Sequence, residues 1–114
     1  MQVNTADKGD YTLMTVSGRM DATSSPLFDE AAKALGASPP NHVLVDLRRL
    51  VFVSSSGLRS FLALAKSVQK AGNKTAFCSL SSMAEDVFKI AGFMSILKIY
   101  PDEASAAAGF KADT

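Results

Sequence analysis

Segments with strand-like and helix-like hydrophobic patterns alternate along nearly the whole chain of 114 residues. Strands are expected at 2–5, 11–16, 43–45, 75–78 and 96–100, and helices near 26–35, 58–71, 82–91 and 103–110. After an opening pair of strands, this alternation favours right-handed crossover connections and a mostly parallel sheet. The sequence therefore predicts one α/β domain over residues 1–114, with a mixed sheet of about five strands and about four helices.

Two of the expected helices have recognisable capping residues. Ser25 precedes Pro26, which is favoured as a first helical residue, so Ser25 is the expected N-cap. Ser82 and Glu85 have the spacing of a capping box, which predicts that the third helix begins there.

Three hydroxyl residues, Ser54, Ser55 and Ser56, stand with Gly57 between an apolar run and an amphipathic segment. The apolar run, which ends at Val53, is typical of a buried strand. The segment after it has one apolar face, formed by Leu58, Phe61, Leu62, Ala65 and Val68. A serine at such a junction lies beside unpaired backbone N–H groups and the positive end of the helix dipole. It can cap the helix and can also carry a phosphate, which makes the segment a candidate switch.

Charge and composition exclude several classes of partner. The chain has 12 Lys and Arg against 11 Asp and Glu, a net charge of +1, and its basic residues are scattered. Nucleic acids and anionic membranes are bound through dense basic patches, so we expect no nucleic-acid partner. No apolar run approaches about 18 residues and no signal-peptide stretch opens the chain, which predicts a cytoplasmic protein without membrane insertion.

The usual signatures of enzyme chemistry are missing from the sequence. There is no glycine-rich nucleotide loop, and Val53 stands where a nucleophile elbow would need glycine. The only histidine, His42, and the only cysteine, Cys78, form no catalytic pair and no zinc cluster. We expect His42 at an exposed or capping position and Cys78 in the core. The sequence therefore predicts a protein that is not an enzyme and uses no metal or other cofactor.

Four short motifs carry a family resemblance. They are Gly-Arg-Met-Asp at 18–21, Asp-Leu at 46–47, Val-Ser-Ser-Ser-Gly-Leu at 53–58 and Ile-Ala-Gly-Phe at 90–93. In this order and spacing the chain resembles, over roughly residues 2–110, the bacterial STAS domains, and specifically the single-domain anti-sigma factor antagonists. The resemblance implies the STAS fold.

The resemblance also implies regulation by partner switching. In such proteins the unphosphorylated form binds an anti-sigma factor that is also a serine kinase of the Bergerat ATPase type. Phosphorylation of a serine at the start of the second helix breaks the complex, and a metal-dependent phosphatase reverses it. Placed on the family motif, Ser55 takes the acceptor position, and Ser54 and Ser56 are less favoured acceptors. Ser54 stands where the family more often has an acidic residue.

A docking face for the partner is expected around the same motif. It comprises Asp21, Ser54, Ser56, Gly57, Leu58 and Arg59. Leu58 and neighbouring apolar groups are expected to lie at its surface. Asp21 is expected first as a turn or capping residue, with partner contact as a lesser role.

Other interpretations remain open at this point. Helix capping alone explains the serines, and it is compatible with phosphorylation because a single hydroxyl suffices as the cap. A second class of function is an adaptor subunit of a larger assembly, such as a stressosome-like scaffold or a lipid-transport ATPase complex. A third is a sensor of a small molecule or nucleotide.

Overall fold

The computed structural model describes residues 1–36 and 41–112 as six strands and four α-helices with one short 3-10 helix. In chain order the elements are β1 (Gln2–Asp7), β2 (Tyr11–Met20), α1 (Ser25–Gly36), β3 (His42–Asp46), β4 (Leu50–Val53), α2 (Ser55–Lys70), β5 (Thr75–Cys78), α3 (Ser82–Ile90), η1 (Phe93–Ser95), β6 (Lys98–Tyr100) and α4 (Glu103–Ala112). The α/β class is confirmed, and β4 is a strand beyond the five expected.

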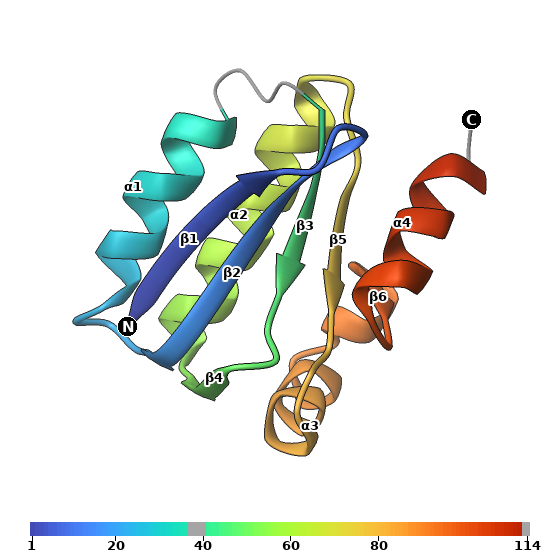
Figure 1. Ribbon diagram of the computed structural model, residues 1–114. Helices are drawn as coiled ribbons and strands as arrows, with labels where there is room; N and C mark the ends of the chain where they lie inside the picture. The colour runs from blue at the N-terminus through green and yellow to red at the C-terminus, as the bar shows by residue number, and fades with distance from the viewer. Residues whose placement is uncertain (37–40, 113–114) are drawn as a thin grey trace.

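One mixed sheet runs through the molecule in the order β1-β2-β3-β5-β6 (Figure 1). The β1–β2 pair is antiparallel and the other pairs are parallel, as the alternation of elements predicted. The first half of β2 pairs with β3, and its last residues pair with β4. The register shifts between Gly18 and Arg19, where Gly18 has a φ of +93° that favours glycine. This irregularity lets one long strand serve two partners.

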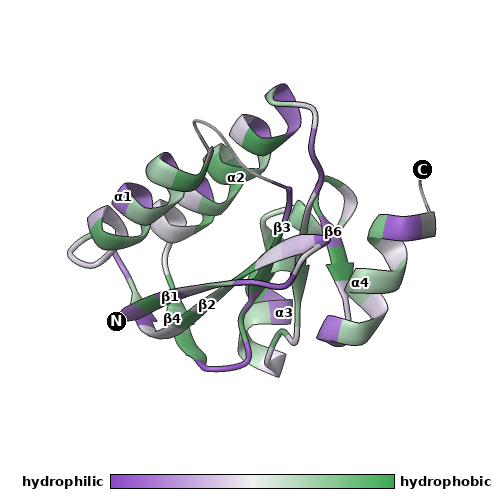
Figure 2. Ribbon diagram, turned by 45° about the horizontal axis from the view of Figure 1, so that its top comes forward, coloured by the Kyte–Doolittle hydropathy of each residue, from purple (hydrophilic) through white to green (hydrophobic). Residues whose placement is uncertain are grey.

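Helices cover both faces of the sheet. On one face α1, α2 and α3 bury an aromatic cluster, in which the Phe61 ring lies 5.2 Å from Phe28 and 5.4 Å from Phe77. On the other face α4 covers a smaller core (Leu44, Ala76, Cys78, Ala106 and Phe110). The helices α1 and α2 are striped green and purple in Figure 2, as expected for amphipathic helices on a sheet. Cys78 is buried, as predicted.

The helix α3 begins at Ser82, as predicted, but Ser82 is not its N-cap. Its N-cap is Ser81, whose hydroxyl accepts the Ala84 N–H at 3.2 Å, so the capping box at Ser82 was placed one residue late. The buried residues of α3 are Ala84 and Phe88, whereas Ile90 is 88% exposed. Ala84 and Phe88 are four residues apart, so they form the stripe of this short helix that faces the core.

Candidate functional site at the start of α2

The site lies where β2 and β4 end and α2 begins. Met20 and Val53 are register partners at the ends of the two parallel strands. The backbone N–H of Ser54 donates to the Met20 carbonyl at 2.8 Å, which ties the start of α2 to the end of β2. Carboxyl ends of parallel strands are the usual place for functional sites in α/β sheets, and the serine motif stands at this edge.

The three serines of the motif have different environments. Ser54 is the N-cap: its hydroxyl accepts the Gly57 N–H at 3.3 Å, and its carbonyl accepts the Leu58 N–H at 3.0 Å. The Ser56 hydroxyl accepts a hydrogen bond from the Arg59 guanidinium at 3.3 Å. Ser55 is exposed, and its hydroxyl takes part in none of the hydrogen bonds found among residues 1–36 and 41–112. Ser55 is thus the accessible hydroxyl of the motif.

Gly57 is required by close packing. It is buried, and a Cβ built on it would lie 2.8 Å from Val53 Cγ2 and 3.0 Å from Met20 Cγ. Contacts this short require Val53, Met20 or the start of α2 to shift. Gly57 therefore sets how closely the start of α2 approaches β2 and β4.

Leu58 does not form part of the surface, contrary to the expectation for the docking face. Its side chain is only 7% exposed and belongs to the main core. The exposed apolar group nearest in sequence to the motif is instead Val51 of β4, which is 64% exposed. On the same strand, Phe52 packs against Arg19, with the guanidinium 4.4 Å from the ring centre. The apolar part of this surface comes from β4, because α2 turns Leu58 inward.

Asp21 caps the turn that leads into α1. Its carboxylate accepts the backbone N–H groups of Thr23 and Ser24 at 3.0 and 3.1 Å. These bonds, the one from Ser24 first, lower the pKa of the Asp21 carboxyl. Ser25 is not the N-cap that was expected, because its hydroxyl donates to the Asp21 carbonyl at 2.6 Å. The predicted turn or capping role of Asp21 is confirmed, and its contact with a partner stays a prediction.

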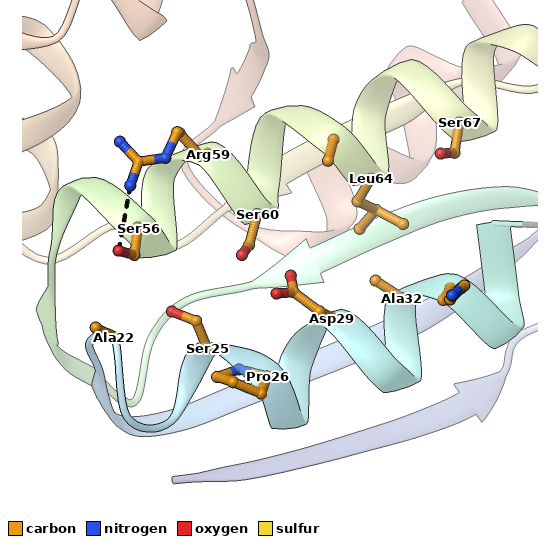
Figure 3. Close-up of a pocket in the computed structure, with 12 residues that line it drawn as sticks. Ala22, Ser25, Pro26, Asp29, Ala32, Ser56, Arg59, Ser60, Leu64 and Ser67 are labelled. Carbon is orange, nitrogen blue, oxygen red and sulfur yellow. Dashed lines mark hydrogen bonds between the residues drawn. The ribbon is translucent and has the colours of Figure 1, made fainter.

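A groove of about 550 Å³ opens between α1 and α2 beside the motif (Figure 3). Small and polar side chains line it: Ala22, Ser25, Pro26, Asp29, Ala32, Lys33, Ser56, Arg59, Ser60, Ala63, Leu64 and Ser67. Most of these residues had no role in the sequence interpretation. The signal that could have marked the groove is the recurrence of small residues at positions 56, 60, 63 and 67, which lie along one stripe of α2.

Within the described parts of the chain, no group of three or more His, Cys, Asp or Glu residues could hold a metal ion. Burial raises the pKa of the Cys78 thiol to about 11, so this thiol is not an activated nucleophile. None of the helices in residues 1–36 and 41–112 is long and apolar enough to span a membrane.

Comparison with known proteins places this geometry in a family. The family model of the STAS domain matches residues 2–106. BtrV of Bordetella bronchiseptica, whose name assigns it as an anti-sigma factor antagonist, is 32% identical over 108 residues, which cover 94% of this chain and 93% of BtrV.

Two solved structures show the same fold. An anti-sigma factor antagonist from Mycobacterium paratuberculosis has a TM-score of 0.87 at 22% identity, covering 96% of this chain and 93% of the other. The Bacillus cell fate determinant SpoIIAA in its phosphorylated form has a TM-score of 0.72 at 14% identity, covering 94% and 98% of the two chains. With the family match spanning nearly its whole length, this chain belongs to the STAS domain family.

Proposed function

We propose that this chain is an anti-sigma factor antagonist that works by partner switching. In its unphosphorylated form it binds an anti-sigma factor that is also a serine kinase of the Bergerat ATPase type. The kinase phosphorylates Ser55, the complex dissociates, and a metal-dependent serine phosphatase restores the binding form. The chain itself is a regulator and not an enzyme. The name of its relative BtrV and the phosphorylated form of SpoIIAA support this proposal.

The observation that carries the proposal is the exposed hydroxyl of Ser55. Ser54 is occupied as the helix cap and Ser56 is held by Arg59, whereas Ser55 projects from the first residue of α2 without a partner among the described residues. A phosphate at this position lies at the positive end of the helix dipole. The scaffold can therefore carry the modification, and its effect falls on the surface that a partner would contact.

A phosphate is sufficient to separate two proteins at this surface. It adds about −1.5 to −2 charges, which must be desolvated or paired when a partner covers Ser55. A tenfold loss of affinity corresponds to only about 1.4 kcal/mol. Exposed apolar groups such as Val51 make desolvation of a neighbouring dianion costly in a complex.

Phosphorylation in vitro tests the acceptor. The chain is incubated with ATP and each serine kinase of the Bergerat type from the same genome, and the modified residue is identified by peptide mass spectrometry. We expect one phosphate, on Ser55, and none in Ser55→Ala. A phosphate on Ser54 or Ser56 in the parent chain would contradict the assignment.

Binding to the same kinases tests the switch. In calorimetric titrations we expect Ser55→Ala to bind like the parent chain and to stay bound in the presence of ATP, while Ser55→Asp loses at least about tenfold in affinity. Equal binding by both variants would refute charge-driven release. Stable copurification with a transporter ATPase, and with no kinase, would instead favour the adaptor role.

A further inference from the structure

The groove between α1 and α2 is lined by a serine hydroxyl whose hydrogen-bonding capacity is not used within the described residues. Ser60 is only 7% exposed, and its hydroxyl takes part in no hydrogen bond in the portion of the chain that the structure describes. Figure 3 shows this hydroxyl pointing across the groove toward α1. A hydroxyl can both donate and accept a hydrogen bond, so one that faces an open groove can bind a polar ligand.

The charges around the groove favour an acidic ligand. Two cations, Arg59 and Lys33, line it against one carboxylate, Asp29. Neither cation forms a salt bridge with any residue in 1–36 or 41–112. The contact of Arg59 is with the neutral hydroxyl of Ser56 at 3.3 Å, which is long for a guanidinium hydrogen bond. Arg59 can therefore exchange this contact for a carboxylate at little cost.

The walls of the groove leave room for a polypeptide segment. Ala22 and Ala32 stand on the α1 side. Ala63 lines the groove from α2. These short side chains let another chain approach both helices closely. The groove is lined at the start of α2 by Ser56, which follows Ser55 directly in the chain.

We propose, on the basis of the function proposed above, that an acidic side chain of the anti-sigma factor enters this groove. Its carboxylate pairs with Arg59, and a polar group of the same segment bonds the Ser60 hydroxyl. Phosphate on Ser55 then competes for Arg59. Ser55 precedes Arg59 by four residues, which places the two side chains on the same face of α2. Phosphorylation thus repels the acidic segment and also occupies the cation that binds it.

The first test measures binding of the anti-sigma factor that forms a complex with the parent chain. We expect Arg59→Gln to weaken binding about tenfold and Ala63→Met, which fills the groove, to weaken it similarly. Lys66→Gln is the control for lost charge, because Lys66 is exposed on α2 but does not line the groove. Ala108→Met on α4 is the control for added bulk. Both controls should bind like the parent chain.

The outcomes of this test separate the two proposals. If the parent chain binds and the groove variants bind equally well, the groove proposal is wrong and the proposed function stands. If the parent chain binds no anti-sigma factor of its genome, the proposed function fails and the groove proposal fails with it. Circular dichroism of every variant confirms that binding was measured on folded protein.

A second test needs no partner. The second pKa of the phosphate on Ser55 is measured by phosphorus NMR in the phosphorylated chain and in its Arg59→Gln variant. Pairing with Arg59 should lower this pKa below its usual value of about 6, and the variant should raise it again. The same pKa in both proteins would overturn the competition for Arg59.

Discussion

Three neighbouring serines at the start of α2 have the same chemistry and separate tasks. Ser54 caps the helix, Ser56 contacts Arg59, and Ser55 is exposed. From the sequence alone, all three serines were expected near free backbone N–H groups. Which of them caps the helix depends on the residue at which the helix begins, and a shift of that residue by one position changes the cap. Capping and phosphorylation are compatible here because they fall on different residues.

The division of tasks predicts unequal effects of removing each hydroxyl. Ser54→Ala should lower the free energy of unfolding by about 1 kcal/mol, since the Gly57 N–H loses its acceptor. Ser55→Ala removes an exposed hydroxyl and should change the free energy of unfolding by less than about 0.5 kcal/mol. Urea unfolding of the two variants beside the parent chain measures the difference. Equal losses would show that Ser54 is not the cap.

Gly57 is the residue of the motif that should tolerate substitution least. Gly57→Ala would place a Cβ at 2.8 Å from Val53 Cγ2 and 3.2 Å from the Met20 carbonyl oxygen. Alanine usually stabilises a helix relative to glycine, by about 1 kcal/mol. Overpacking against the strands should outweigh this gain, so that Gly57→Ala lowers the free energy of unfolding by about 1–3 kcal/mol. Thermal unfolding of Gly57→Ala measures this change in stability, and Ser56→Ala is the control one residue away. A Gly57→Ala variant more stable than the parent chain would contradict the packing argument.

Among the elements, those with strong local patterns were predictable. The apolar face of α2 was correct at Leu58, Phe61 and Val68, all of which are buried. The apolar run of β4 was typical of a buried strand, but it was not counted as a strand separate from the one at 43–45. Its separate place in the sheet depends on pairing with the end of β2 beyond the bulge, which no local pattern encodes.

The groove between α1 and α2 was missed for a related reason. The helix α1 carries two adjacent large apolar residues, Leu27 and Phe28, but Leu27 is 49% exposed, and Phe28 and Ala32 are the buried residues. The rotation of α1 about its axis decides which side chains face α2. That rotation is fixed by packing between two helices and the sheet, so the sequence could mark the motif but not the groove beside it.

The contact of α4 with β3 predicts that the stability of the fold depends on pH. Neutral His42 accepts the Lys74 N–H at 3.0 Å, and its ring stacks on Phe110 of α4. Burial, and after it the charge of Lys74, lowers the His42 pKa below 6.5, while Asp10 opposes the shift. Because the folded-state pKa is the lower one, this stabilisation is complete above pH 6.5 and is lost as the pH falls below it.

The urea midpoint should therefore fall as the pH is lowered from about 7.5 to about 5. His42→Asn keeps an acceptor for the Lys74 N–H but does not titrate, so its midpoint should vary less over the same range. The lowered carboxyl pKa values of Asp21 and Asp102 act below 3.8, outside this window. If the urea midpoint of the variant changed with pH as much as that of the parent chain, His42 would not be the source of the pH dependence.

On the scale of the whole molecule, the candidate switch and the main core share one part of the fold. The start of α2 stands at the edge where β2 and β4 end (Figure 1). The same helix carries both Ser55 and the buried Phe61. A modification at Ser55 could then act in two ways, by changing the surface or by loosening the core. The exposure of Ser55 and the dipole of a 16-residue helix favour the first.

Thermal unfolding of the phosphorylated chain separates these two modes of action. A dianion at the first residue of α2 should stabilise the helix by about 0.3–1 kcal/mol at low ionic strength. At about 4 °C per kcal/mol for a domain of this size, the melting temperature should rise by about 1–4 °C. Added salt should reduce the gain, because it screens an exposed charge. The unphosphorylated Ser55→Ala variant, carried through the same kinase reaction, is the matched control. A melting temperature that falls on phosphorylation would mean that the phosphate acts by loosening the fold, because a surface switch leaves the core contacts of α2 in place.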